Sequence, residues 1–152
     1  MKKHIPNAVT MINLAAGCLA IVSCLEGNYG LVLLLVAVSL IADFADGLLA
    51  RALDAKSELG VQLDSLADAV SFGVLPGMIL FILLEQAFAH PIMEGVTTVA
   101  DYSAGVLRPE YLGFLFTIFA VVRLGKFNID TRQTENFIGL STPAASLFVF
   151  GL

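Results

Sequence analysis

Four aspartates interrupt the most apolar part of this sequence. Asp43 and Asp46 lie near the end of one apolar run, and Asp64 and Asp68 lie near the start of the next. A charged side chain at bilayer depth costs at least about 2.5–3.5 kcal/mol, so such residues are rare and usually functional. These carboxylates are therefore the first candidates for chemistry.

The spacing of the aspartates indicates a shared ligand. Asp43 and Asp46 are three residues apart, and Asp64 and Asp68 are four apart, so each pair occupies one helical face. A short polar connector makes the two helices antiparallel, which lets the pairs meet. Four carboxylates repel one another unless cations neutralise them, and an all-oxygen cluster suits Mg²⁺ or Mn²⁺. The pattern predicts two divalent cations, a recurring arrangement in phosphoryl displacement.

The residues between the aspartates suit a phosphate-bearing ligand. Gly47 and Ala50 leave one helix surface bare, so that a ligand can approach the backbone closely. Arg51 can pair with a phosphate through its planar guanidinium group. Other interpretations remain. Arg51 could be an interfacial anchor, with the glycines serving helix packing. The acids could form a proton or cation pathway of a transporter, or be scattered helix-end residues that face water.

Composition predicts the elements that must position these residues. Of 152 residues, 58% are hydrophobic and 14% are charged, whereas soluble domains carry about 25% charge. A membrane helix needs about 20 apolar residues. We expect an all-α, polytopic transmembrane helical bundle, a single domain over 1–152, with Pro76-Gly77 kinking the third helix. The apolar runs cover about 8–25, 30–50, 63–84 and 110–124, with a fifth beginning near Thr142.

The basic residues predict the orientation in the membrane. If the runs alternate across the bilayer, seven of the eight Lys and Arg residues fall on one side, which should be the cytoplasm. The N-terminus and the carboxylates would then face the cytoplasm from the cell (inner) membrane. Glu26 and Asn28 follow the first run without a small-residue cleavage site, which favours a retained helix over a signal peptide. The short fifth run, ending at Leu152, favours a C-terminally truncated chain.

The aspartates belong to a longer motif that resembles a known signature. Eight fixed positions run across the two apolar runs and resemble the signature of the CDP-alcohol phosphatidyltransferase family. The resemblance implies a membrane-helical fold with a dinuclear metal site. The segment reads Asp43-x2-Asp46-Gly47-x2-Ala50-Arg51-x8-Gly60-x3-Asp64-x3-Asp68.

This resemblance implies a role for each matching residue. Three aspartates would ligate the metals, and Asp68 would serve as both a ligand and the general base. Further positions resemble contacts to the CDP-diacylglycerol nucleotide, although a loop serine and helix-capping residues are the alternatives for the last three. The implied ligands are Asp43, Asp46, Asp64 and Asp68, and the implied nucleotide contacts are Gly47, Arg51, Ser57, Asn7 and Thr10.

Sequence segments outside the motif resemble one branch of the family. The segments SELGVQLDSLADAVSFGVLPG, RLGKFN at Arg123–Asn128 and FIGLSTPAAS at Phe137–Ser146 resemble the bacterial phosphatidylserine synthases. That branch implies transfer of a phosphatidyl group from CDP-diacylglycerol to L-serine, giving phosphatidylserine and CMP. Arg123, Lys126 and Asn128 are candidates for holding the serine carboxylate or a phosphate; the alternative for Arg123 and Lys126 is a role as positive-inside anchors.

Several alternatives stay open from the sequence alone. The acceptor could instead be glycerol 3-phosphate or inositol phosphate, and the chain could instead be a cation transporter or a structural membrane subunit. The motif contains no histidine or cysteine, so we expect direct displacement by the acceptor without a covalent intermediate. The expected partners are CDP-diacylglycerol, L-serine and membrane lipid, with no nucleic acid; a homodimer is compatible with the resemblance.

Overall fold

Every regular element of the described chain is helical, which confirms the predicted all-α class. A computed structural model describes residues 4–55, 57–92, 108–129 and 142–151. The elements, in chain order, are α1 His4–Leu25, α2 Tyr29–Ala52, α3 Glu58–Asp68, the π-helical segment η1 Ala69–Val74, α4 Leu75–Ile92, the 3₁₀ turn η2 Pro109–Leu112, α6 Gly113–Ile129 and α7 Thr142–Phe150.

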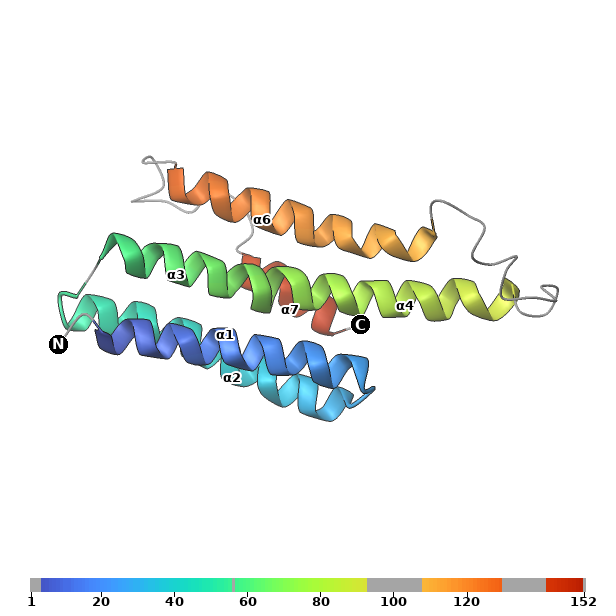
Figure 1. The fold of residues 1–152 in the computed structure, drawn as a ribbon, viewed down its shortest axis with the longest axis horizontal. Coiled ribbons are helices and arrows are strands. Elements are labelled where there is room, and N and C mark those ends of the chain that lie inside the picture. The colour runs from blue at the N-terminus through green and yellow to red at the C-terminus, as the bar shows by residue number, and fades with distance from the viewer. Residues whose placement is uncertain (1–3, 56, 93–107, 130–141, 152) are drawn as a thin grey trace.

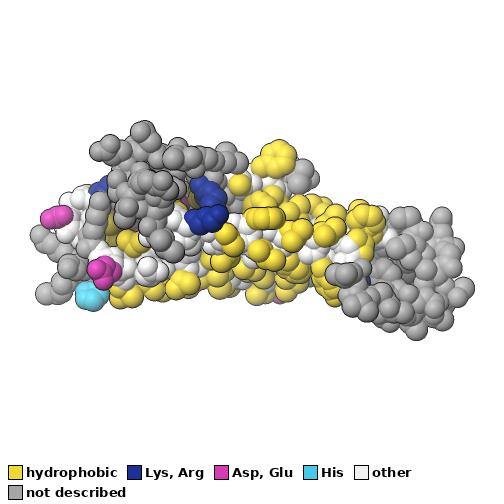
Figure 2. All heavy atoms as spheres, turned by 90° about the horizontal axis from the view of Figure 1, so that it is seen from above, with side chains coloured by type: hydrophobic (Ala, Val, Ile, Leu, Met, Phe, Trp, Pro, Cys, Tyr) yellow, Lys and Arg dark blue, Asp and Glu magenta, His cyan; other side chains and the backbone are white. Residues whose placement is uncertain are grey.

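The helices run along one long axis (Figure 1). The α1–α2 hairpin lies on one side of the rod formed by α3 and α4, and α6 lies on the other side. Within the described residues, three segments are long and apolar enough to cross a membrane: His4–Leu25, Tyr29–Ala52 and Glu58–Phe88. Hydrophobic side chains cover the middle of the face drawn in Figure 2. These features fit an integral membrane protein.

The fourth and fifth predicted spans correspond to shorter helices. The fourth run forms α6, which has 17 residues and begins after the η2 turn. This length is near the lower limit of about 17 residues for a membrane span. The fifth run forms α7, which has 9 described residues. Membrane crossing by these two helices stays a prediction.

A tight turn makes α1 and α2 antiparallel neighbours. The α1 helix ends with Gly27 in the left-handed region, at φ 72°, where the Asn28 backbone N–H donates to the Ser23 carbonyl at 2.9 Å. This is the Schellman arrangement, for which glycine is the favoured residue. The Asn28 side chain then accepts from the Leu31 N–H at 3.2 Å and caps α2. The hairpin therefore follows from Gly27-Asn28.

Residues 69–74 break the regular α-helical hydrogen bonding immediately before Pro76. The last π-helical hydrogen bond is the one that the Leu75 N–H donates to the Val70 carbonyl, five residues earlier. Pro76 has no N–H, so the carbonyl four residues earlier, that of Phe72, loses its α-helical donor. The Ser146 hydroxyl of α7 donates to that carbonyl at 2.6 Å. The predicted kink at Pro76-Gly77 is therefore wrong: a π-helical segment accommodates the proline, and α3 and α4 continue along one line (Figure 1).

We expect Ser146→Ala to lower stability by about 0.6–2 kcal/mol, because it removes the donor to the buried Phe72 carbonyl. Thermal unfolding in detergent micelles would measure this loss. Ser23→Ala is the matched control, since the Ser23 hydroxyl donates only to the Leu19 carbonyl of its own helix, at 2.9 Å. An equal fall in melting temperature for both variants would contradict this role of Ser146.

Glycines allow α4 and α6 to pack closely. A Cβ added at Gly113 would lie 2.5 Å from the Phe81 backbone nitrogen and 3.0 Å from the Gly77 carbonyl oxygen. Nearby, the Thr117 hydroxyl donates to the Gly73 carbonyl at 2.9 Å. Small residues that permit backbone approach are typical of membrane helix interfaces. This crossing positions α6 beside the α3–α4 rod.

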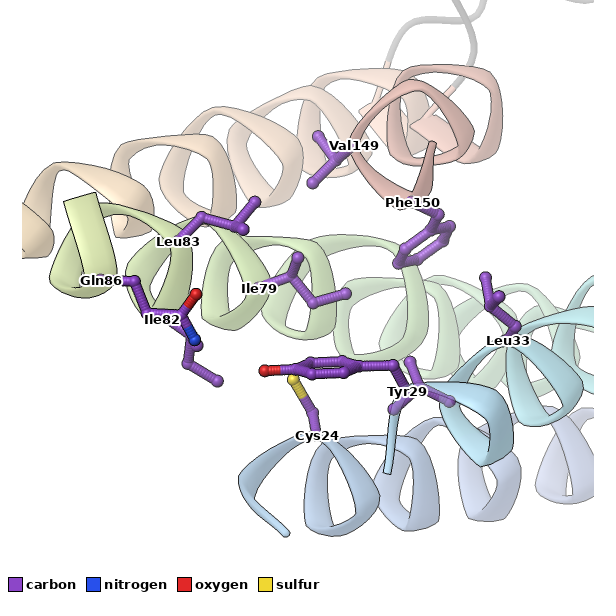
Figure 3. Close-up of a pocket in the computed structure, with 10 residues that line it drawn as sticks. Cys24, Tyr29, Leu33, Ile79, Ile82, Leu83, Gln86, Val149 and Phe150 are labelled. Atoms are coloured by element: carbon purple, nitrogen blue, oxygen red, sulfur yellow. The ribbon is translucent and has the colours of Figure 1, made fainter. Parts of the chain in front are cut away.

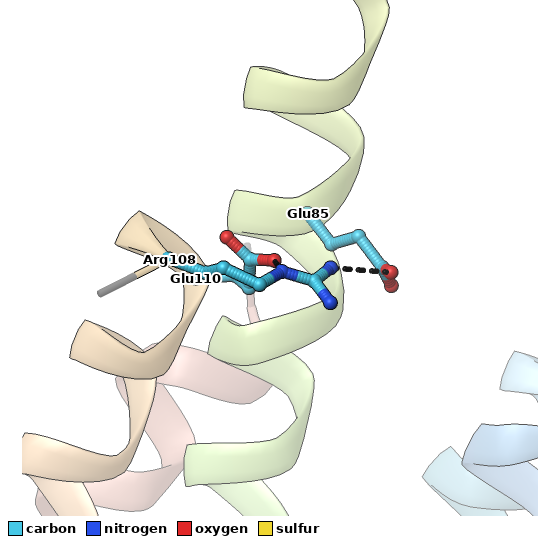
Figure 4. A network of polar contacts seen from close by, with 3 residues as sticks. All are labelled: Glu85, Arg108 and Glu110. Atoms are coloured by element: carbon cyan, nitrogen blue, oxygen red, sulfur yellow. Dashed lines mark ion pairs between the residues drawn. The ribbon is translucent and has the colours of Figure 1, made fainter. Parts of the chain in front are cut away.

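An ion-pair network joins the α4 segment to the start of η2 (Figure 4). The Arg108 guanidinium pairs with the fully buried Glu110 and lies 3.8 Å from the Glu85 carboxylate. Its charge also lies 5.8 Å from the centre of the Tyr111 ring. Breaking a buried ion pair leaves an uncompensated charge. The network therefore holds the start of η2 against α4.

Candidate metal centre

Three of the four predicted ligands form one cluster. Carboxylate oxygens of Asp43, Asp64 and Asp68 all lie within 4.8 Å of one another. Asp43 lies in the C-terminal half of α2, and the other two lie on α3. The connector between these helices turns at Asp54, whose φ is 48°. Ser57 caps the start of α3, and its hydroxyl accepts from the Gly60 N–H at 3.0 Å. The predicted meeting of the two pairs is confirmed for these three residues.

The charge of the cluster calls for a cation. Two unit charges 4.8 Å apart repel by about 3 kcal/mol at an effective dielectric constant of about 20. Among the described residues, both ion pairs lie elsewhere, around Arg108. The donor set consists of oxygen atoms, the ligands that hard divalent cations prefer. The three carboxylates therefore fit a divalent metal ion.

The fourth predicted ligand, Asp46, makes a different contact. The Thr10 hydroxyl of α1 donates to Asp46 Oδ2 at 2.5 Å, and both side chains are buried. Asp46 is one helical turn beyond Asp43, so it lies beside the cluster without belonging to the set of three. Thr10 lies well inside α1, which excludes the capping alternative for this residue. Metal ligation by Asp46 stays a prediction.

The predicted nucleotide contacts lie near the ends of α1, α2 and α3. A Cβ at Gly60 would lie 3.1 Å from both Asn7 Oδ1 and Ser57 Oγ, so the three residues are neighbours. Close packing at Gly60 is thereby confirmed. Ser57 caps α3, whereas Asn7 lies inside α1.

The Gly47 and Arg51 positions also lie together. The Arg51 Nε donates to the Gly47 carbonyl at 3.0 Å, one turn back along α2. The Arg51 side chain is exposed, and a Cβ at Gly47 would meet only the Arg51 guanidinium, at 3.8 Å. The surface beside Gly47 is therefore open, as expected for a ligand-facing glycine.

The three candidate acceptor residues have different surroundings. The Arg123 guanidinium of α6 donates to the Thr142 hydroxyl of α7 at 2.5 Å, so in this structure it joins two helices. The Asn128 amide donates to the Ser65 hydroxyl of α3 at 2.9 Å, which places the end of α6 beside the aspartate-bearing helix. Lys126 is exposed. Their role with an acceptor stays a prediction.

The structure adds a buried polar network that the sequence analysis missed. Asn13 donates to Asp68 Oδ1 at 3.2 Å, the Ser39 hydroxyl donates to Asn13 Oδ1, and the Ser71 hydroxyl donates to the Asn13 carbonyl at 3.2 Å. One available signal was the spacing of Asn7, Thr10 and Asn13, three residues apart along one helical face of an apolar run. A polar stripe in a membrane helix indicates a polar partner.

An apolar cavity of about 290 Å³ lies away from this chemistry (Figure 3). Cys24, Tyr29, Ile82 and Phe150 are among its lining residues. Cys24 follows Asn13 by eleven residues in α1, which is about 16 Å along a helix. The cavity is therefore separate from the carboxylate cluster.

Comparisons with known proteins identify relatives along nearly the whole chain. Residues 3–150 match the family described as CDP-alcohol phosphatidyltransferase. The chain is 33% identical over 148 residues to a Bacillus subtilis CDP-diacylglycerol–serine O-phosphatidyltransferase, covering 95% of this chain and 72% of the relative. No solved structure gives a match.

Two further relatives carry the same name. Identity is 32% over 155 residues with the Mycobacterium tuberculosis protein, covering 97% of this chain and 48% of that relative. It is 32% over 146 residues with the Helicobacter pylori protein, covering 95% and 54%. The chain therefore spans about half the length of several curated relatives.

Proposed function

Because this chain belongs to the CDP-alcohol phosphatidyltransferase family, we propose that it makes phosphatidylserine and CMP from CDP-diacylglycerol and L-serine. The acceptor is inferred from relatives named as serine enzymes at 32–33% identity over most of this chain. One structural observation carries the chemistry: Asp43, Asp64 and Asp68, which occupy motif positions, place carboxylate oxygens within 4.8 Å of one another.

In this proposal the three clustered aspartates, together with Asp46, hold two divalent cations, Mg²⁺ or Mn²⁺. Cations bound there would neutralise the diphosphate and the charge that develops on the transferred phosphoryl group. The observed donor set fits this assignment, since all of its ligand atoms are carboxylate oxygens. Asp46 is one turn from Asp43 on α2, beside the cluster.

The reaction is a single displacement at phosphorus. Asp68 accepts the proton of the serine hydroxyl, and the serine oxygen forms a bond to the phosphorus that carries the diacylglycerol. The bond from that phosphorus to the bridging diphosphate oxygen breaks, and CMP leaves with the bonding electrons. Arg51, exposed one turn beyond the open surface at Gly47, would pair with the diphosphate.

The chain positions two substrates of unlike polarity. The cluster lies towards the end of the molecule where the chain begins and where α2 connects to α3 (Figure 1). Nucleotide and serine would reach this end from water, whereas the acyl chains would remain in lipid beside the apolar helices. In keeping with the distribution of Lys and Arg, we place this end at the cytoplasmic face of the inner membrane.

The alternative acceptor keeps the same chemistry and changes only the alcohol. Asn128 contacts Ser65, the neighbour of Asp64 on α3, so the end of α6 is close enough to the cluster's helix to contribute to an acceptor site. In this proposal Asn128, together with Lys126 and Arg123, would bind the carboxylate of serine. A phosphate on glycerol 3-phosphate or inositol phosphate would offer the same residues a similar negative charge.

The assay is CMP release from CDP-diacylglycerol by the purified chain in lipid, with each alcohol added separately. We expect release with L-serine and only background release with glycerol 3-phosphate or inositol phosphate. Release only with another alcohol would replace the acceptor. Cation flux in liposomes without CMP release would favour the transporter alternative, and exchange of labelled CMP without any acceptor would contradict direct displacement.

A further inference from the structure

We propose that Asn13 is a positioning residue, which holds the Asp68 carboxylate in its working orientation within the cluster. This inference rests on the proposed function for its catalytic consequence. The direct evidence is the hydrogen bond from Asn13 Nδ2 of α1 to Asp68 Oδ1 of α3, at 3.2 Å. Both residues are buried, Asn13 completely and Asp68 with 8% of its surface exposed.

The Asn13 amide is held in one direction by a second helix. The Ser39 hydroxyl of α2, with 1% of its surface exposed, donates to Asn13 Oδ1. Because the oxygen end of the amide accepts from Ser39, the nitrogen end is directed at Asp68. A buried amide with both ends bonded has one favourable orientation. Ser39 therefore acts on Asp68 through Asn13.

The backbone of Asn13 is held as well. The Ser71 hydroxyl of η1 donates to the Asn13 carbonyl at 3.2 Å. Gly17, one helical turn after Asn13, makes this approach possible: a Cβ there would clash with Ser71 Oγ and lie 3.1 Å from Ser71 Cα. η1 directly follows Asp68 in the chain. These contacts therefore fix the position of Asn13 along the axis of the helix that carries Asp68.

The arrangement leaves Asp68 able to do chemistry. A carboxylate has about four acceptor sites, and the Asn13 N–H uses one of them. A single donor therefore leaves acceptor capacity on this carboxylate for a cation and for the proton of the acceptor. A neutral amide donor also adds no charge to a cluster whose three carboxylates lie within 4.8 Å. Partners of this kind orient metal ligands, and their loss typically lowers affinity or activity by about 10–100-fold.

The test compares Asn13→Leu and Ser39→Ala with Ser23→Ala in the full chain. Ser23 is a buried serine of α1 whose hydroxyl donates to Leu19 of the same helix, so its variant should match the wild type. For Asn13→Leu we expect kcat to fall by about 10–100-fold with a KM for CDP-diacylglycerol within about two-fold. Ser39→Ala, which keeps Asn13 but frees its amide to turn, should show a smaller fall in kcat.

Binding of Mn²⁺ alone, measured by calorimetry without substrate, gives a second readout. We expect the Kd for Mn²⁺ to rise by about 10–100-fold in Asn13→Leu and less in Ser39→Ala. If Asn13→Leu does not fold, the kcat and Mn²⁺ affinity of Ser39→Ala test the inference. Wild-type kcat and Mn²⁺ affinity in the folded variants would overturn the inference, as would equal losses in Ser23→Ala. A wild-type chain that binds Mn²⁺ but never releases CMP would contradict the proposed function. The Mn²⁺ affinities of the variants would still test the positioning role of Asn13.

Discussion

The Asp68→Asn variant is expected to lose turnover by about 10²–10⁴-fold, the usual contribution of a positioned general base. An asparagine cannot accept the proton of the serine hydroxyl, whereas its amide oxygen can still accept the hydrogen bond from Asn13. The substitution keeps size and shape and removes one of three mutually repelling charges. The variant should therefore fold at least as stably as the wild type and still bind CDP-diacylglycerol.

Three measurements are needed for this variant: the rate of CMP release, the affinity for CDP-diacylglycerol and the melting temperature. Asp54→Asn is the matched control, because Asp54 is an exposed acid in the α2–α3 connector. Its φ of 48° is a conformation that asparagine also adopts readily. The control should retain native activity. Near-native turnover of Asp68→Asn would show that Asp68 is not the base.

Removal of divalent cations is expected to abolish activity, and Mg²⁺ or Mn²⁺ should restore it. The reason lies in the cluster, where three carboxylates have oxygens within 4.8 Å of one another and no ion pair with a described Lys or Arg. Without a cation, the diphosphate of the substrate would add further negative charge to the same place. Activity in excess EDTA, followed by titration with each cation, measures this dependence.

Thermal unfolding separates loss of metal from inhibition by the chelator. A cation that binds only the folded chain stabilises it by about 2.7 kcal/mol at 100 times its Kd, so Mg²⁺ should raise the melting temperature. The double variant Asp43→Asn, Asp64→Asn removes two of the three clustered carboxylate charges. Neutral amide oxygens attract a divalent cation less strongly, so this variant should lose that shift. Full activity in excess EDTA would contradict the metal-dependent mechanism.

Local chemistry made much of the fold predictable. The apolar runs around residues 8–25 and 30–50 had to form helices, because backbone groups in a bilayer must bond within their own segment, and α1 and α2 match them closely. Gly27-Asn28 supplies the turn between them. The clustering of Asp43 with Asp64 and Asp68 followed from helical periodicity and one short connector.

The ends of helices were less predictable, because packing partners decide them. The third apolar run was expected over 63–84, yet the helical rod extends from Glu58 to Ile92, and Ser57 caps its start in the connector. Pro76 led us to expect a kink, whereas the structure has a π-helical segment before it, whose carbonyl groups bond to donors remote in sequence. Ser146 bonds the Phe72 carbonyl and Thr117 bonds the Gly73 carbonyl.

The sequence by itself determined which residues are capable of the chemistry: four carboxylates at helical spacing, with glycines and an arginine between them. Only the tertiary structure decided which partner each carboxylate has: three of them form one cluster, and Asp46 accepts a hydrogen bond from Thr10. It also brought Asn13 to Asp68 across 55 residues of chain. Helical periodicity sets the face that a side chain occupies, whereas the partner across that face depends on how separate helices slide and rotate against one another.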